Sequence, residues 1–462
     1  MNCNQKKSNC QLGFAGLSAL VFGMMVGAGI FNIPQNMAAG AGLGAVLLSW
    51  IITAAGMLLL VFTFKRLSDS HPELDAGIYQ YAAKGYGPFT GFVTAWGYWL
   101  CTGFANVAYV VMLNDTIGAL YPPLLNHGVD TILFGSVLIW GIYLVIIAGM
   151  RTAKILTSVL AAVKVATILL IVILLGLNIR CGMFSIDFRG EVSQLGGLAE
   201  QVKSTMLVTL WCFIGIEGAV MMSGRARRSS DVGKAGVTGF FTAWLLYVLV
   251  SVFCFGVMIR GELAELDNPS VAYVLRTVCG EWAYWLVIIS VIISLGGGLV
   301  AWTLVCAEVP YSAARVGILP RQFQRLNSRR MPAFGLFVSS IVMQAFLFIV
   351  MTAEDIYLEA LNITGMMILP AYLVSGMFLW KISLGRDRMG VTIGAACTLF
   401  CLWMIYAGGL DLFTRTSLFY IAGLGFWVKA RHERGSHRLS RDEAAGLAVI
   451  ALCALWSVWR MV

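Results

Sequence analysis

Charged residues are scarce in this sequence. Asp, Glu, Lys and Arg make up 12% of its 462 residues, whereas an ordinary soluble protein carries about 25%. Apolar residues make up 59% of the chain, so a soluble fold is excluded. One bilayer crossing takes about 20 apolar residues, and thirteen crossings would take roughly 260. The apolar content therefore predicts that almost the whole chain lies in a membrane.

The sequence also lacks the motifs of several function classes. It contains no G-x-x-x-x-G-K-[ST] segment, which excludes a phosphate-binding loop and the use of ATP. Its 11 cysteines show no C-x-x-C spacing, so we interpret them as reduced packing residues and expect no metal site and no cofactor. His432 and His437 are five residues apart, whereas a zinc protease helix needs four. No apolar run combines a nucleophile with a base, so we expect no enzyme activity.

The net charge of +9 does not indicate a nucleic-acid partner. The basic residues form short clusters between apolar runs, whereas a nucleic-acid-binding domain concentrates them on one face. The basic stretch 429–441 is typical of a loop that contacts anionic membrane lipid.

Thirteen apolar runs predict thirteen membrane-spanning helices. The runs lack the period-2 alternation of barrel strands, and only helices or closed barrels satisfy the backbone inside lipid. We therefore expect an all-α integral membrane protein with 12–13 transmembrane helices. The runs cover 12–33, 42–64, 86–118, 129–149, 153–178, 203–223, 233–259, 282–310, 333–352, 356–380, 390–410, 413–428 and 444–461.

Basic residues alternate between the two sides of this arrangement. With a cytoplasmic N-terminus (residues 1–11), the inner segments hold 24 of the 32 Lys and Arg residues, and the outer segments hold seven. The remaining one, Lys164, falls inside a span. This asymmetry follows the positive-inside rule and predicts a cytoplasmic N-terminus. An odd number of spans then places the C-terminus outside.

Glycine interrupts the first and sixth spans, at 27–29 and 215–218. The two positions correspond if spans one to five (12–178) and six to ten (203–380) are copies of one unit, followed by extra helices (390–462). Five is odd, so the second copy must be inverted. Broken helices at matching places in inverted halves indicate a transporter site near the membrane midplane. Ordinary helix-packing glycines are the alternative.

Broken helices leave backbone groups without partners. Free N–H groups at the start of a half-helix suit a carboxylate, and free carbonyls suit an α-ammonium group. The two breaks therefore predict a clamp for the backbone of an α-amino acid.

Glu217 and Trp211 belong to the second break. A carboxylate in mid-membrane costs at least about 2.5 kcal/mol and is by default a functional candidate. Glu217 is expected to be protonated or to hold a cation. A neutral acid that hydrogen-bonds to a neighbouring span is the alternative. The ring of Trp211 suits a guanidinium or ammonium group, although packing would explain this residue equally well.

Three further residues carry polar groups inside spans. Lys164 lies about 16 Å from the end of its span, so its ammonium must find carbonyls or a carboxylate, lose its proton, or lean into a water-filled vestibule. We interpret it as a tethered substitute for a coupling ion, or as a proton carrier. Tyr98 and Asn106 share one broad face of the third span, where an Asn more often joins helices than binds a solute.

Together these segments resemble the basic amino acid/polyamine antiporters of the amino acid-polyamine-organocation (APC) superfamily, nearest to its arginine/ornithine and arginine/agmatine exchangers. The resemblance covers about the first 380 residues. It rests on 26–31 with Pro34, 72–79, Tyr98 to Asn106, 211–217, 223–226, and Gly298 to Leu304.

The resemblance implies two inverted five-helix repeats with broken first and sixth helices. It also implies a role for particular residues. The substrate-binding residues would be Ala28, Gly29, Ile30, Asn106, Trp211, Ile214 and Trp302; the gating residues Tyr98, Trp211, Glu217 and Trp302; and the ion- or proton-coupling residues Lys164 and Glu217. The sequence departs from the arginine/agmatine pattern at Ala28, where serine is usual, and at Tyr109, where methionine is usual.

These observations predict a bacterial inner-membrane transporter that exchanges arginine for its product, ornithine or agmatine, by alternating access. Its partners would be small cationic amino acids or polyamines and membrane lipid, and a homodimer is compatible with the sequence. A proton-coupled importer of cationic amino acids is the main alternative. A membrane enzyme or a nutrient receptor is a second one.

Overall fold

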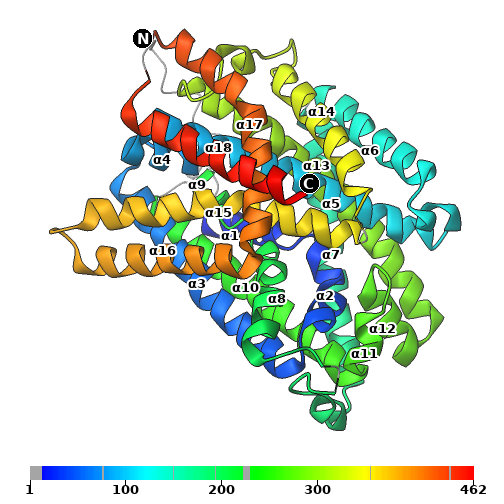
Figure 1. Cartoon of the computed structure of the whole chain (residues 1–462). Helices are drawn as coiled ribbons and strands as arrows, with labels where there is room; N and C mark the ends of the chain where they lie inside the picture. Colours follow the sequence, from blue (N-terminus) through cyan, green and yellow to red (C-terminus); the bar gives the residue numbers. More distant parts are fainter. Residues whose placement is uncertain are drawn as a thin grey trace.

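A computed structural model describes residues 13–74, 77–148, 150–192, 194–221, 229–353, 355–435 and 439–461. Over these residues the chain is helical and has no strand, as the sequence predicts (Figure 1). The predicted cytoplasmic N-terminus and the basic residues at 225–228 lie outside the described residues.

Each of the thirteen apolar runs contains a helix, and shorter helices lie between them. In chain order the α-helices are α1 (Phe14–Met25), α2 (Ile33–Gly40), α3 (Leu43–Ser70), α4 (Ile78–Tyr86), α5 (Pro88–Gly118), α6 (Val129–Ile147), α7 (Met150–Leu177), α8 (Leu198–Trp211), α9 (Gly218–Met221), α10 (Ser229–Val257), α11 (Arg260–Ala264), α12 (Ser270–Cys279), α13 (Glu281–Arg315), α14 (Ala333–Val350), α15 (Ile356–Ser383), α16 (Arg388–Gly408), α17 (Leu410–Glu433) and α18 (Arg441–Met461). The 3₁₀ helices η1 (Ala28–Phe31), η2 (Pro122–Asn126), η3 (Cys181–Ser185) and η5 (Arg321–Gln324) lie between them.

Nine of the helices within the described residues are long and apolar enough to cross a membrane: α3, α5, α6, α10, α13, α14, α15, α16 and α18. Two of the remaining runs are interrupted, since the first is split into α1, η1 and α2, and the sixth into α8 and α9. The short helices α4, α11 and α12 were not predicted. They lie in connections, where no long apolar run marks them.

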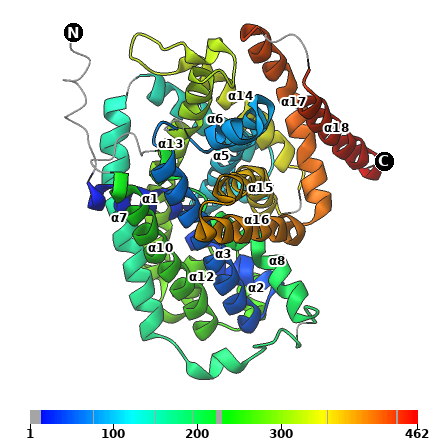
Figure 2. The ribbon, with the colours of Figure 1, turned by 90° about the vertical axis from the view of Figure 1, so that its left-hand side faces the viewer.

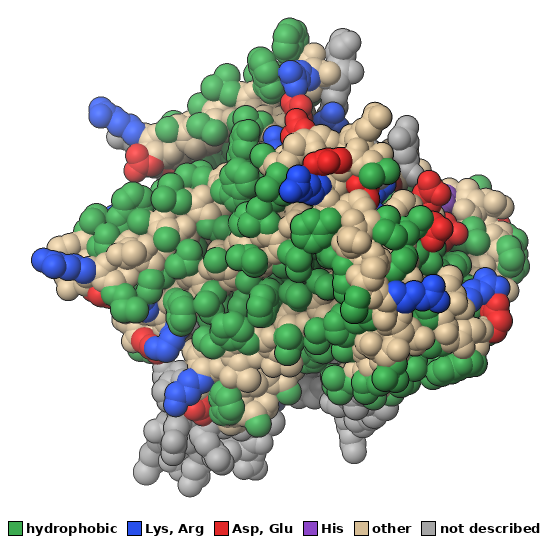
Figure 3. All heavy atoms as spheres, turned by 90° about the horizontal axis from the view of Figure 1, so that it is seen from below, with side chains coloured by type: hydrophobic (Ala, Val, Ile, Leu, Met, Phe, Trp, Pro, Cys, Tyr) green, Lys and Arg blue, Asp and Glu red, His purple; other side chains and the backbone are tan. Residues whose placement is uncertain are grey.

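Helix α5 lies in the middle of the bundle, with α13, α14 and α15 packed around it (Figure 2). In its most apolar 18-residue stretch, 94% of the residues are buried, compared with 22% for α6 and 17% for α18. Apolar side chains cover most of the face shown in Figure 3, and charged side chains are sparse there. A face with many apolar and few charged side chains is expected where the surrounding medium is lipid.

Both predicted helix breaks are present. The α-helical hydrogen bonding of α1 ends at Met25, and that of α8 ends at Trp211. From 212 to 217 the chain instead forms turns. Their hydrogen bonds join residues three apart, such as the bond from the Gly218 N–H to the Gly215 carbonyl (2.9 Å). Gly215 has φ +110°, a conformation that side-chain-bearing residues rarely adopt. Gly215 thus allows the chain to turn away from the axis of α8 at the second break.

We expect Gly215→Ala to disrupt this break. An added Cβ would lie 2.9 Å from the backbone carbonyl of Met24, and the positive φ alone costs about 1–3 kcal/mol. The apparent melting temperature of the purified variant, measured in detergent, should fall clearly below that of the original chain.

Gly425→Ala is the matched control, because nothing lies within 4 Å of an added Cβ on this α17 residue. It should leave the melting temperature unchanged or raise it slightly, since glycine weakens a helix interior. Equal melting temperatures for the two variants would contradict the assigned role of Gly215.

Candidate functional site

Glu217 joins three elements at the second break. Its side chain is fully buried, and it accepts hydrogen bonds from the Tyr98 hydroxyl of α5 (2.9 Å) and the Tyr372 hydroxyl of α15 (2.7 Å). It also accepts one from the backbone N–H of Gly215 (3.1 Å). A buried carboxylate needs such donors to offset its lost hydration. Glu217 therefore fixes the unwound segment against two neighbouring helices.

Lys164 occupies the first break from the side of α7. Its ammonium group donates to the backbone carbonyls of Gly23 (3.2 Å) and Val26. The hydroxyl of Tyr247, on α10, donates to the Met25 carbonyl (2.8 Å). The last carbonyls of α1, which have no helical partners, are thus satisfied by two side chains of the protein. The ammonium of Lys164 thus binds backbone carbonyls, which is one of the alternatives that the sequence left open.

A small cavity lies between the two breaks, with a volume of about 10 Å³, roughly the space of one water molecule. Its walls come from the breaks and from α5, α10 and α13. They consist of Met24, Met25, Gly27, Gly29, Ala105, Tyr109, Trp211, Cys212, Ile214, Tyr247 and Trp302.

Aromatic rings fill the space that the glycines of the first break leave. A Cβ at Gly29 would lie 2.9 Å from Cδ1 of Trp211, and one at Gly27 would lie 1.9 Å from Oη of Tyr109. The Tyr109 and Trp211 ring centroids are 6.5 Å apart. Both positions need glycine because the two rings pack directly against the backbone there. The rings thereby cover the backbone of the first break.

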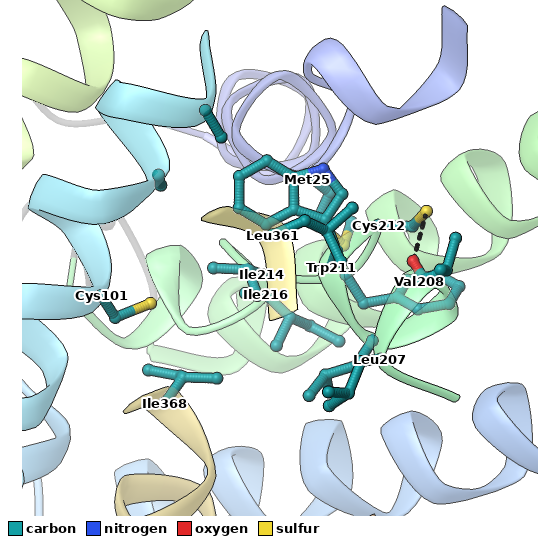
Figure 4. Close-up of a cluster of buried hydrophobic side chains, with 14 of the residues drawn as sticks. Met25, Cys101, Leu207, Val208, Trp211, Cys212, Ile214, Ile216, Leu361 and Ile368 are labelled. Carbon is teal, nitrogen blue, oxygen red and sulfur yellow. Dashed lines mark hydrogen bonds between the residues drawn. The ribbon is translucent and has the colours of Figure 1, made fainter. Parts of the chain in front are cut away.

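Apolar side chains support the indole of Trp211. Figure 4 shows Trp211 together with Met25 and Leu361, and Ile214 follows it in the break. The thiol of Cys212 donates to the Val208 carbonyl (3.2 Å) at the end of α8. Trp211 is the last residue of α8, and its side chain lines the cavity.

Seven of the ten predicted site residues fall into three groups. Gly29, Trp211, Ile214 and Trp302 line the cavity, whereas Tyr98 and Glu217 form the hydrogen-bonded cluster and Lys164 lies at the first break. Ile30 is buried but is not part of the cavity wall, and the side chain of Ala28 lies outside the described residues.

Asn106 is also absent from the cavity wall. It donates to the Thr102 carbonyl (2.8 Å) and accepts from the Thr303 hydroxyl of α13 (3.2 Å). In this structure its amide joins two helices, the more common use of a membrane-embedded Asn.

Sequence reasoning gave no role to Tyr247 and Tyr372. Both lie in long apolar runs, where a tyrosine gives no periodic or charge signal. For Tyr109, the sequence did give a signal, because methionine is usual at this position in the arginine/agmatine pattern.

Comparison with known proteins identifies the family. The model of the amino acid permease family matches residues 12–428. The chain belongs to the amino acid permease family. The arginine/agmatine antiporter of Chlamydia trachomatis serovar L2 is 39% identical over 97% of this chain and 96% of its own. That of Chlamydia pneumoniae is 37% identical over 99% and 98%.

The fold comparison agrees with this assignment. A Na⁺-coupled sialic acid symporter, solved in a substrate-bound outward-open state, aligns with a TM-score of 0.53 and 11% identity, covering 88% of this chain and 90% of that one. This match confirms the predicted transporter fold. The permease family and its relatives are transporters, so the chain is a multi-pass membrane transporter and not an enzyme.

We expect Tyr98→Phe and Tyr372→Phe each to destabilise the folded protein. Each change removes one hydroxyl donor from the buried carboxylate of Glu217, and a hydrogen bond to a charged group contributes about 1.5–3 kcal/mol. The measurement is the apparent melting temperature in detergent of the single and double variants.

Tyr420→Phe is the control, because the Tyr420 hydroxyl is buried without a partner among the described residues. Its removal should not lower the melting temperature. If all three single variants behaved alike, the hydroxyl bonds to Glu217 would not be what stabilises the break.

Proposed function

We propose that this permease exchanges extracellular arginine for intracellular agmatine. The observation that carries the proposal is the similarity to arginine/agmatine antiporters along nearly the whole chain. Exchange needs no ATP, because an outward gradient of product drives inward movement of substrate. Ornithine is the second counter-substrate that we propose to test.

In this proposal the two breaks bind the amino acid backbone of arginine. The N–H groups of the first break, beside Gly29, receive the carboxylate, and carbonyls of the second break receive the amino group. The guanidinium stacks on Trp211, with Ile214 and Trp302 completing the wall. No acidic residue is among the described residues that line the cavity, so rings and carbonyls must supply the attraction. Ala28, Ile30 and Asn106 stay proposed contacts of a wider, substrate-filled site.

The residues around the cavity would control access. We assign Trp211 and Trp302 to closing the cavity itself, and Tyr98 with Glu217 to a further gating layer beside it at the second break. Lys164 supplies a tethered cation at the first break, and with Glu217 it is the candidate for ion or proton coupling. An exchanger must also reorient poorly when empty, since otherwise it would leak, and the small cavity is consistent with a closed empty state.

The proposed location of the permease is a bacterial inner membrane. The proposal includes a cytoplasmic N-terminus, a first repeat at 12–178, a second at 203–380 and additional helices at 390–462. It includes a homodimer embedded in membrane lipid as well.

Counterflow in proteoliposomes tests the exchange. Vesicles preloaded with agmatine should take up labelled arginine, whereas empty vesicles should not. Parallel vesicles preloaded with ornithine or lysine identify the counter-substrate. Uptake into empty vesicles driven by a pH gradient would instead support the proton-coupled importer, and binding of arginine without any uptake would support a receptor.

We expect Trp211→Ala to weaken arginine binding more than tenfold, about 1.4 kcal/mol, because the guanidinium loses its stacking partner. Isothermal titration calorimetry on the purified protein measures this change. Trp282→Ala is the control, since Trp282 is 57% exposed at the start of α13, and it should bind like the original chain. Undiminished binding by Trp211→Ala would remove the basis for its assigned role.

A further inference from the structure

Asp115 is a buried carboxylate that lacks a close cationic partner. It lies near the end of α5, with its side chain 8% exposed. It accepts hydrogen bonds from the side-chain amides of Asn268 (2.8 Å) and Asn114 (3.4 Å). Among the described residues, no Lys or Arg forms an ion pair with it. The nearest basic group is Nδ1 of His127, 4.0 Å away on a side chain that is 40% exposed.

Two amide oxygens add to the negative character of this place. Oδ1 of Asn114 and Oδ1 of Asn32 are both buried and have no hydrogen-bond donor among the described residues. Asn32 in turn donates from Nδ2 to Oδ1 of Asn268. The four residues Asn32, Asn114, Asp115 and Asn268 form a continuous group, here called the outer cluster. Buried acceptors without donors are costly, so the outer cluster is suited to a ligand that brings N–H groups and positive charge.

The outer cluster lies close to the cavity along two elements. On α5, Asp115 is six residues beyond Tyr109, about 9 Å along the helix axis, and Tyr109 lines the cavity. On the first broken helix, Asn32 is three residues beyond Gly29, which also lines it. By the predicted orientation, both elements run from the cavity towards the outside of the cell.

We propose that the outer cluster is a transient binding site for the guanidinium or ammonium group of the substrate, occupied before the substrate enters the cavity. This inference rests on the proposed transport of a cationic substrate. The charge is complementary, since the cluster contains a carboxylate and two amide oxygens without donors, whereas the cavity wall has no acidic residue among the described ones. A guanidinium provides several N–H donors in a plane and suits such a set of acceptors.

Binding there would act on the first break. A guanidinium at Asp115 competes with the amide of Asn268 for the carboxylate. Asn268 also holds Asn32, and the neighbouring Ser270 hydroxyl donates to the Phe31 carbonyl at the end of η1 (3.3 Å). Displacing Asn268 would therefore loosen the contacts that hold the outer side of the break, which couples arrival of a cation to opening.

The test is Asp115→Asn, which keeps the shape of the side chain and removes its charge. Uptake of labelled arginine is measured at the same fixed pH for every variant. Intact cells present only the outer face to added substrate, and inverted membrane vesicles present the inner face. We expect the apparent KM in intact cells to rise at least fivefold, with the KM in inverted vesicles unchanged. The salt dependence of the outer KM should also decrease.

Two further variants make the result specific. Asp130→Asn removes an exposed carboxylate in the first turn of α6 and should leave the outer KM unchanged. The Asn268 oxygen already accepts from Asn32, so it is not one of the free acceptors, whereas its N–H group occupies the carboxylate. Asn268→Ala therefore removes a competitor for Asp115 and should lower the outer KM, the opposite direction to Asp115→Asn.

An unchanged outer KM for Asp115→Asn would overturn the inference. So would an equal loss from both faces, because a merely structural role affects both directions of transport alike. If Asp115→Asn does not fold, the direction of the Asn268→Ala effect decides instead, and an unchanged or raised outer KM then counts against the site. Failure of the original chain to transport arginine at all would refute the proposed function and is distinguished by that control.

Discussion

The site depends on satisfying backbone groups that two broken helices release inside a membrane. No water is available there to hydrogen-bond them, and each unsatisfied group costs several kcal/mol. Lys164 and Tyr247 supply donors to the end of α1, and Glu217 accepts the N–H of Gly215 at the second break. The donors and acceptors come from helices distant in sequence. The requirement for partners therefore ties α5, α7, α10 and α15 to one central point.

Because the released backbone groups need partners, the ionisable side chains at the breaks bind the protein and not the contents of the cavity. The ionisable groups nearest the breaks, Lys164 and Glu217, are engaged with the protein itself. The cavity between them is lined by rings, small residues and methionines, with no acidic side chain in its described wall. A cationic solute placed there is attracted by ring faces and peptide dipoles, whose interactions are individually weak. Such a site favours exchange over retention, because a carrier that holds its cargo too tightly cannot release it.

The sequence predicted the fold well because membrane helices are encoded locally. Hydropathy located all thirteen runs, and the glycines at 27–29 and 215–218 located both breaks, since each signal lies within one short segment. Partners that meet only in three dimensions were missed. Tyr247 and Tyr372 resemble any other tyrosine in an apolar run, and the bond from Thr303 to Asn106 joins two helices that are distant in sequence. Helices α4 and α12 were missed because short amphipathic segments between spans carry little hydropathy signal.

Tyr109 shows how tightly the interior of this permease is built. Its ring lies where a Cβ at either Gly27 or Gly298 would have to be, at 1.9 Å from Oη and 2.5 Å from Cε1 respectively. Residues 27, 109 and 298 come from three different parts of the chain, and their side chains would compete for the same space. A larger residue at 27 or 298 therefore requires a smaller one at 109 first, whereas position 109 itself can become smaller while both glycines stay, so the order of changes here is fixed: the ring must shrink before either glycine can be replaced.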